Sequence, residues 1–209
     1  MSFVITIAQQ KGGAGKTMVA VNLAAALAAT RRVAVLDIDP QRSLARWHEL
    51  RERQSRPLPK ITASDLSGWR LRSELNRLRQ SHDVVVVDSP PHIDTDAKLA
   101  VREADLVLVP LQPSPPDLWA AEGTLKLAQA EKRLVRLLLN RTPASSRLRS
   151  LVEQEIAGGG YALLTSTLGN RAGFANAFAV GMGVTEASPK SQAAREMVAL
   201  LAEVEALLA

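Results

Sequence analysis

The amino-acid sequence predicts an α/β fold, with a twisted, mainly parallel sheet covered by helices on both faces. Short apolar runs rich in Val, Leu and Ile alternate with longer runs that have helical spacing, as in chains of strand–helix units. Aromatic residues make up only 3% of the 209 residues, so we expect an aliphatic core of helices on a sheet and not an aromatic-rich β-sandwich. This length suits one domain, residues 1–209.

Five apolar runs have the length and the continuous apolar character of strands that are buried on both faces. They are Phe3–Ala8, Val33–Asp37, Val84–Asp88, Leu106–Pro110 and Leu134–Asn140. Helical spacing between them predicts helices at Thr17–Thr30, Ser43–Arg53, Trp69–Ser81, Thr95–Glu103 and Asp117–Arg133. Beyond these we expect a helix at Ser146–Ala157, a further strand at Ala162–Thr165 and a last helix at Ser191–Leu208.

The bulk composition limits the classes of function. There are no cysteines, which excludes disulfides, thiolate zinc sites, iron–sulfur clusters and cysteine nucleophiles. The first apolar run is too short for a secretory signal, and no apolar stretch reaches the roughly 18 residues of a membrane span, so we expect a cytoplasmic protein. The net charge of +5 favours a polyanionic partner only weakly, because many soluble proteins carry as much.

The turn between the first strand and the first helix, KGGAGKT at residues 11–17, predicts a phosphate-binding loop. Glycines let backbone N–H groups approach a phosphate closely at the positive end of a helix dipole. We expect Lys16 to reach the β- and γ-phosphates and the Thr17 hydroxyl to ligate Mg²⁺. The alternative is a glycine-rich turn in which six specified positions coincide by chance. The nucleotide-binding residues expected here are Lys11, Gly12, Gly13, Ala14, Gly15, Lys16, Thr17 and Met18.

Two acidic segments follow predicted strands, DIDPQ at residues 37–41 and DSPP at residues 88–91. The carboxyl ends of parallel strands line the crevice where ligands bind, so both segments should face the loop. A carboxylate there can hold Mg²⁺ through water and orient an attacking water, although each aspartate alone could also cap the following helix. We expect Asp39 to position the water and Asp37 to support the site. The expected metal-binding residues are Thr17, Asp39 and Asp88.

The loop K-G-G-x-G-K-T opens with Lys11 and has Gln10 in place of the usual first glycine, and in this it resembles the deviant Walker A motif of the ParA/MinD family of P-loop ATPases. DIDPQ resembles the family's switch I, and VVVVDSPP resembles its Walker B and switch II. The resemblance covers nearly the whole chain and is looser after about Thr142. It implies a P-loop NTPase fold, slow partner-stimulated hydrolysis of ATP, and a homodimer in which Lys11 contacts the partner's nucleotide. The catalytic residues it implies are Lys11, Lys16, Asp39 and Asp88.

The proline-rich segment at residues 111–120, LQPSPPDLWA, resembles the P-x-P-S-P-x-D stretch of small plasmid partition ATPases. Similar runs occur in relatives that position carboxysomes. Because prolines fix φ, the segment forms either a rigid wall that covers the base, with Pro113 in contact, or shapes the dimer contact, or else a plain turn before a helix that Asp117 caps. Asn140 ends its strand where the family reads adenine, which implies ATP as the nucleotide.

The resemblance also implies a DNA-bound state, because partition ATPases bind DNA non-specifically when they are loaded with ATP. A basic face is predicted from Lys132, Arg133, Arg136, Arg141, Arg147 and Arg149, joined by Arg171, Lys190 and Arg195. A second basic run holds Arg42, Arg46, Arg51, Arg53, Arg56 and Lys60. The alternative is that these cations lie on ordinary solvated helix faces. We expect a plasmid or chromosome partition protein on the nucleoid, with non-specific DNA and a ParB-like adaptor as partners.

Other branches of the family have sequence features that this chain lacks. The MinD-like branch ends in a basic amphipathic helix, whereas the last helix here is acidic, so no membrane partner is expected. Its charged residues include Glu196, Glu203 and Glu205 against Arg195. ParA-like positioning of a protein cargo, such as a carboxysome or a chemoreceptor cluster, remains an alternative. So does a P-loop biosynthetic enzyme, which would need an acceptor pocket.

Overall fold

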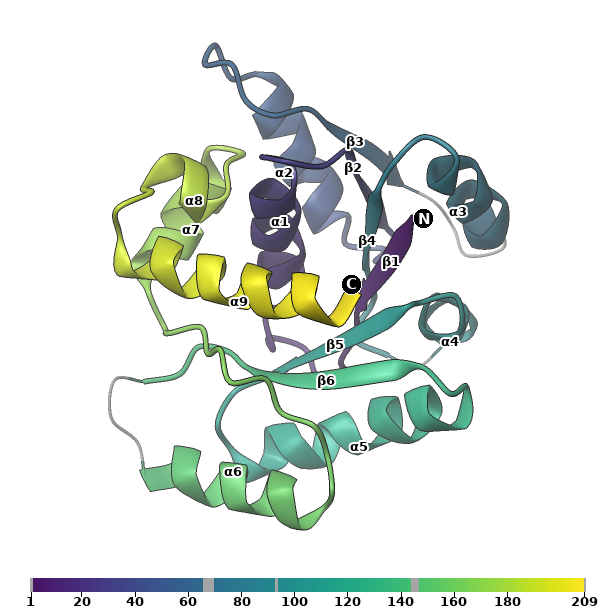
Figure 1. The fold of residues 1–209 in the computed structure, drawn as a ribbon, viewed down its shortest axis with the longest axis vertical. Coiled ribbons are helices and arrows are strands. Elements are labelled where there is room, and N and C mark those ends of the chain that lie inside the picture. The colour runs from purple at the N-terminus through teal and green to yellow at the C-terminus, as the bar shows by residue number, and fades with distance from the viewer. Residues whose placement is uncertain (1, 66–69, 93, 144–146, 209) are drawn as a thin grey trace.

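The computed structural model describes residues 2–65, 70–92, 94–143 and 147–208 (Figure 1). At its centre lies a six-stranded parallel sheet in the order β3-β2-β4-β1-β5-β6. The strands are β1 (Phe3–Ile7), β2 (Val33–Asp37), β3 (Ile61–Asp65), β4 (Val84–Asp88), β5 (Leu106–Leu111) and β6 (Leu134–Leu139). The helices are α1 (Lys16–Leu27), α2 (Ser43–Glu52), α3 (Leu71–Arg79), α4 (Thr95–Arg102), α5 (Pro115–Ala130), α6 (Arg147–Gly158), α7 (Ala172–Ala179), α8 (Val184–Ala187) and α9 (Gln192–Leu208).

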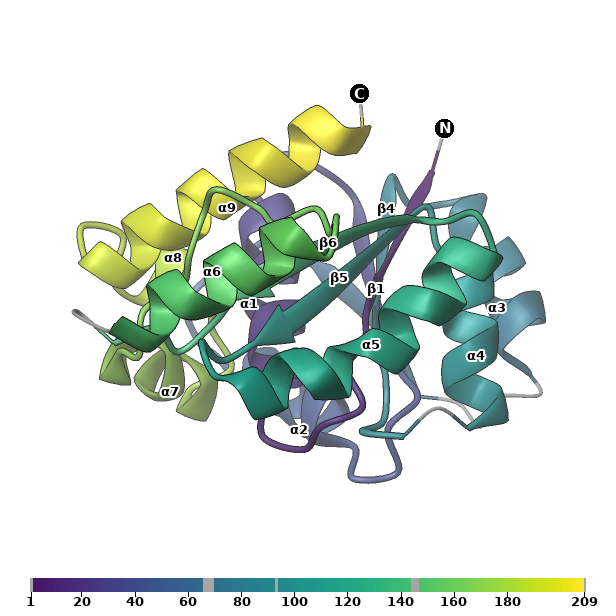
Figure 2. The ribbon, with the colours of Figure 1, turned by 90° about the horizontal axis from the view of Figure 1, so that it is seen from below.

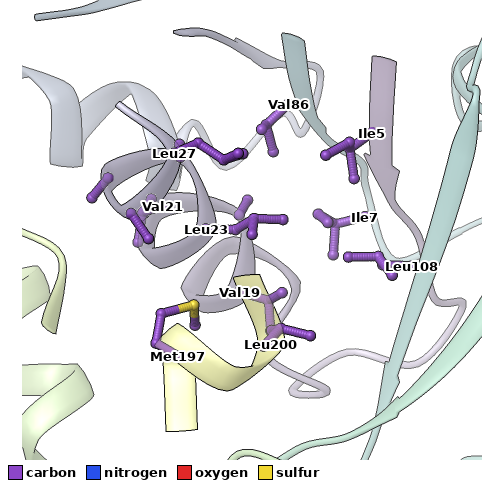
Figure 3. Packing of buried hydrophobic residues seen from close by; sticks show 14 of the residues in the cluster. Ile5, Ile7, Val19, Val21, Leu23, Leu27, Val86, Leu108, Met197 and Leu200 are labelled. Carbon is purple, nitrogen blue, oxygen red and sulfur yellow. The ribbon is translucent and has the colours of Figure 1, made fainter. Parts of the chain in front are cut away.

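One face of the sheet packs against α1, α2, α7, α8 and α9. Helix α1 is buried on nearly all sides because it lies between the sheet and α9, which explains why its residues from Met18 to Leu27 are apolar apart from Asn22 (Figures 2 and 3). From the sheet, Ile5, Ile7 and Val86 point toward Leu23 and Leu27 of α1 (Figure 3). This packing fixes α1, and therefore the turn that precedes it, against the carboxyl end of β1.

The opposite face of the sheet packs against α3, α4, α5 and α6. Successive residues of a strand point to opposite faces, so Val84 and Val86 belong to the α1 side while Val85 and Val87 face α3. Helices on both faces explain why the central strands are continuous apolar runs. The α/β fold expected from strand–helix alternation, a parallel sheet with helices on both faces, is therefore confirmed.

Several predicted element boundaries were wrong. Strand β3 was missed, and it lies at the edge of the sheet, where Ile61 is its only buried residue. Helix α5 begins at Pro115, so Asp117 lies inside its first turn and does not cap it. The strand expected at residues 162–165 is a single bridge between Leu137 and Leu163. The short helices α7 and α8 were also missed.

Two predicted helix starts, Trp69 and Ser146, lie outside the described residues. The helices that follow, α3 and α6, are present from Leu71 and Arg147 onward. Within the described ranges, no helix combines the length and the apolar character needed to cross a membrane.

Candidate nucleotide-binding site

The turn at residues 11–17 lies between the end of β1 and the start of α1, where the helix dipole presents its positive end. Gly13 and Gly15 have φ values of 82° and 88°, the left-handed region that glycine adopts at no steric cost. A Cβ atom at Gly15 would also stand 2.4 Å from the amide nitrogen of Asn140. Both the backbone twist and the close approach therefore require glycine at this position.

Asn140, directly after β6, holds the loop from the other side. Its Nδ2 donates a hydrogen bond to the carbonyl oxygen of Ala14 at 2.8 Å, and its Oδ1 accepts one from the backbone N–H of Arg141 at 2.9 Å. Both ends of the amide are thus engaged within the chain. Reading of adenine by Asn140 stays a prediction, and in this structure the side chain positions the loop.

Lys16, Thr17 and Asp88 meet at the start of α1. The Thr17 hydroxyl donates to Oδ2 of Asp88 at 2.6 Å, and the other carboxylate oxygen has no hydrogen-bond partner within the described part of the chain. Asp88 is fully buried at the end of β4, and burial raises its pKa to about 8, against the opposing hydrogen bond from Thr17. Lys16 is 7% exposed, and burial lowers its pKa, against the attraction of Asp88 and Asp39.

This donor set fits Mg²⁺. The cation prefers oxygen ligands and takes many of them from water and phosphate, so it needs only a hydroxyl and one or two carboxylates from the protein. The unpartnered buried oxygen of Asp88 next to the Thr17 hydroxyl is such a pair. Among the described residues, no three His, Asp or Glu side chains converge as a ready-made metal site. Bound Mg²⁺ would neutralise phosphate charge here.

Asp37 and Asp39 follow β2 and have different surroundings. The buried carboxylate of Asp37 accepts hydrogen bonds from the backbone N–H groups of Asp39 at 3.0 Å and Ala45 at 2.9 Å, which ties the end of β2 to the first turn of α2. Burial raises the pKa of Asp37. Asp39 is half-buried, and its carboxylate accepts from the backbone of Gln41 at 2.9 Å. Asp37 is therefore built into the scaffold, whereas Asp39 borders the open cleft.

Lys11 does not point into the loop in this structure. Its ammonium group forms an ion pair with Oδ1 of Asp117, a carboxylate that is 1% exposed in the first turn of α5. The carbonyl oxygen of Asp117 accepts from the Gln9 side chain at 3.3 Å, which also ties α5 to the segment leading into the loop. No local sequence pattern indicates the role of Gln9 or this pairing, because the partners lie more than 100 residues apart.

The loop opens onto a cleft of about 260 Å³. The cleft is lined by residues of the loop, of both acidic segments and of α7. The lining residues are Gly12, Gly13, Gly15, Lys16, Thr17, Met18, Asp39, Gln41, Ser43, Pro91, Arg141 and Phe178. A neighbouring cavity of about 110 Å³ is lined by Met18, Asn140, Arg141, Gly169, Asn170, Arg171, Phe174 and Ala175. Pro113, predicted as the wall of a base pocket, lines neither cavity, so its contact with the base stays a prediction.

The residues of the predicted basic face extend over both ends of β6. Lys132 and Arg133 precede β6, whereas Arg141 follows it, so the six residues of β6 separate them by roughly 20 Å. Arg149 pairs with Glu153 at 2.7 Å and Arg171 with Glu196 at 2.6 Å. The sequence cluster is therefore divided between the two ends of the sheet.

In the second basic run, Arg51 belongs to the interior. It forms an ion pair with Glu186 at 2.7 Å, bonds the carbonyl oxygen of Gly181 and lies 5.4 Å from the ring centre of Trp47. The side chain fastens α2 to the segment around α8. Its inclusion in a solvent-facing basic run was wrong, because helical spacing alone did not reveal the acidic partner.

A family model described as "CobQ/CobB/MinD/ParA nucleotide binding domain" matches residues 5–184, most of the chain. The matched segment contains the loop, both acidic segments and Asn140.

Two relatives and one solved structure are particularly similar. The "Maintenance of carboxysome distribution protein A" of Halothiobacillus neapolitanus is 30% identical over 203 residues, 94% of this chain and 93% of the relative. The "Chromosome partitioning protein ParA" of Myxococcus xanthus is 32% identical over 161 residues, 59% of this chain and 56% of the relative. The ATP complex of a Cyanothece McdA variant has a TM-score of 0.80 over 99% of this chain and 96% of that one, at 18% identity, a likeness of fold alone.

Proposed function

The chain belongs to the CobQ/CobB/MinD/ParA nucleotide-binding family, and on this premise we propose that it is an ATPase whose ATP-bound homodimer holds non-specific DNA and positions a large cargo. One observation carries the proposal. Lys16, Thr17 and Asp39 line a single cleft at the N-terminus of α1, the buried Asp88 accepts a hydrogen bond from Thr17, and a second lysine, Lys11, opens the same loop. A phosphate chain with Mg²⁺ is the ligand class that matches this combination of cations, hydroxyl and carboxylates.

Within the cleft each side chain has a distinct task. The buried Lys16 ammonium pairs with the β- and γ-phosphates, and the Thr17 hydroxyl with Asp88 provides oxygen ligands for Mg²⁺. Asp39, which borders the same cleft, orients the water that attacks the γ-phosphate. His48 and His82 bond to Ile61 and Thr62 of the edge strand, away from the cleft, so they are not candidates for a general base. We expect slow hydrolysis that a ParB-like adaptor accelerates.

Lys11 provides the switch. In this structure it pairs with Asp117, and in the dimer it would leave that carboxylate and reach the nucleotide of the partner subunit, where it would neutralise charge on the phosphates. The γ-phosphate would then hold the two subunits together, so ATP would favour dimers and ADP would favour monomers.

The cargo has two candidates. Plasmid or chromosome DNA is the first, and it is supported by the relative named a chromosome partitioning protein. A protein assembly is the second, and it is favoured by the relative named for carboxysome distribution, which aligns with 94% of this chain. In either case the ATP dimer would be associated with the nucleoid. An affinity pull-down with an Asp39→Ala variant and ATP separates the candidates by the adaptor it captures.

Co-sedimentation with linear DNA of mixed sequence at low salt tests the proposed activity. We expect wild type to sediment with DNA in ATP and Mg²⁺, and to stay in solution with ADP. Lys16→Ala should stay in solution under both conditions, because it cannot hold the triphosphate. If wild type binds ATP but sediments equally with ATP and ADP, or with neither, the DNA-holding switch is refuted.

A further inference from the structure

Arg141 has a strained backbone that is fastened to the phosphate loop. Its φ is 51°, and only three non-glycine residues in the described ranges have a positive φ. Its N–H donates to Oδ1 of Asn140 at 2.9 Å, and Nδ2 of the same amide donates to the carbonyl oxygen of Ala14 at 2.8 Å. Left-handed backbone at a long side chain persists where surrounding contacts impose it, and such positions are concentrated at binding sites. Here the two hydrogen bonds of the Asn140 side-chain amide position the backbone of Arg141 relative to the phosphate loop.

The side chain of Arg141 lies where the two cavities adjoin. It lines both the 260 Å³ cleft at the loop and the 110 Å³ cavity beside it, and Met18 is the only other described residue that does so. Its Nε is 3.9 Å from the point where a Cβ of Gly15 would stand. A ligand that extends from one cavity into the other must therefore pass next to this guanidinium.

The charge of Arg141 is available to a ligand. The residue is exposed, and among the described residues no carboxylate pairs with its guanidinium, in contrast to Arg149 and Arg171, which pair with Glu153 and Glu196. Arginine binds phosphate oxygens through charge-assisted, often bidentate hydrogen bonds. An unpaired guanidinium at the junction of a phosphate cleft and a cavity lined by Asn170 and Phe174 has the chemistry to hold the part of a nucleotide between its terminal phosphates and its base.

We infer that Arg141 binds the nucleotide itself, by pairing with the α-phosphate, which ATP and ADP share. This inference rests on the proposed nucleotide binding at the loop. It removes Arg141 from the predicted DNA face and gives it a contact that Lys16 and Lys11 do not make. Because the α-phosphate is present before and after hydrolysis, Arg141 would retain the nucleotide throughout the cycle and would not sense the γ-phosphate.

Titration calorimetry with ADP and Mg²⁺ tests the inference on the full chain. Arg141→Asn removes the charge with a residue that tolerates left-handed backbone, and Arg141→Lys keeps the charge. Arg147→Asn is the control, because Arg147 is an exposed cation of the same sequence cluster that lines neither cavity. We expect Arg141→Asn to raise the Kd for ADP about tenfold, which corresponds to about 1.4 kcal/mol, and ATP to show the same ratio. Arg141→Lys and Arg147→Asn should stay within about threefold of wild type.

The outcomes separate this inference from the proposed function. If wild type binds neither ADP nor ATP, nucleotide binding itself is wrong. If wild type binds and Arg141→Asn stays within threefold of it, only the role of Arg141 is wrong. An equal loss in Arg141→Lys would exclude charge pairing, and an equal loss in Arg147→Asn would show a general effect of lost charge, so either result overturns the inference. A thermal unfolding curve without nucleotide checks that each variant is folded.

Discussion

Replacing Lys11 with alanine removes the cation that faces the carboxylate of Asp117. That carboxylate is 1% exposed, and its second oxygen has no hydrogen-bond partner in the described part of the chain. Breaking a fully buried ion pair by deleting one partner costs roughly 3–5 kcal/mol, whereas an exposed pair is worth about 1 kcal/mol or less. The Lys11 side chain is 40% exposed, so we expect an intermediate loss of about 2 kcal/mol in the nucleotide-free protein.

A double-mutant cycle in urea measures this coupling. With an m-value of about 2 kcal/mol/M, Lys11→Ala should lower the unfolding midpoint by about 1 M. Asp117→Asn alone should lower the free energy of unfolding by less than Lys11→Ala does, because the freed lysine returns to solvent. Adding Lys11→Ala to Asp117→Asn should then lower the free energy of unfolding only slightly further. The coupling should be about 1–2 kcal/mol. If the two single effects simply add, or if Lys11→Ala unfolds at the wild-type midpoint, the ion pair does not hold Lys11 and the resting position of the switch is refuted.

Three further predictions follow from single residues. Lys16→Ala should abolish ATP binding in calorimetry, because no other described lysine is buried in the cleft, and residual wild-type affinity would contradict this. Asp88 has a folded-state pKa raised to about 8, so wild type without nucleotide and Mg²⁺ should lose stability as pH rises from about 4 to about 8. In urea denaturation at pH 8, the free energy of unfolding of Asp88→Asn should therefore exceed that of wild type by about 2–4 kcal/mol, and the difference should be smaller at pH 5. Equal unfolding curves for the two proteins would show that the carboxylate is not desolvated. Gly181→Ala should destabilise by more than about 2 kcal/mol, because φ is 67° and the new Cβ would stand 2.2 Å from the backbone nitrogen of Arg51. Gly158→Ala, with nothing within 4 Å of its Cβ, is the control and should be neutral or stabilising.

The sequence predicted those elements whose pattern is local and strongly apolar. Strands β1, β2 and β4 are five-residue runs buried between two helical layers, so their composition alone identifies them. Strand β3 was missed because an edge strand needs few apolar residues, and its sequence ITASD reads as a loop. The start of α5 was misplaced by two residues, since prolines are accepted in the first helical turn, where no N–H partner is required.

The candidate site likewise has features that a local sequence pattern could predict and features that it could not. The phosphate loop could be predicted because its glycines, lysines and threonine act within one short segment. The ion pair of Lys11 with Asp117, the ion pair of Arg51 with Glu186 and the position of Arg141 depend on contacts more than 100 residues apart in the chain. No local pattern contains this information. The reverse holds for the basic residues around β6, several of which are close in sequence but lie at opposite ends of a strand.

The nucleotide dependence of the molecular mass tests the central claim most directly. Light scattering after gel filtration of Asp39→Ala, which should bind ATP but hydrolyse it slowly, measures the mass with ATP and Mg²⁺ and then with ADP and Mg²⁺. We predict twice the chain's 22.5 kDa with ATP and a single chain with ADP, and a monomer in both for Asp39→Ala combined with Lys11→Ala. The same mass in ATP and ADP would contradict a dimer held together through the γ-phosphate and Lys11.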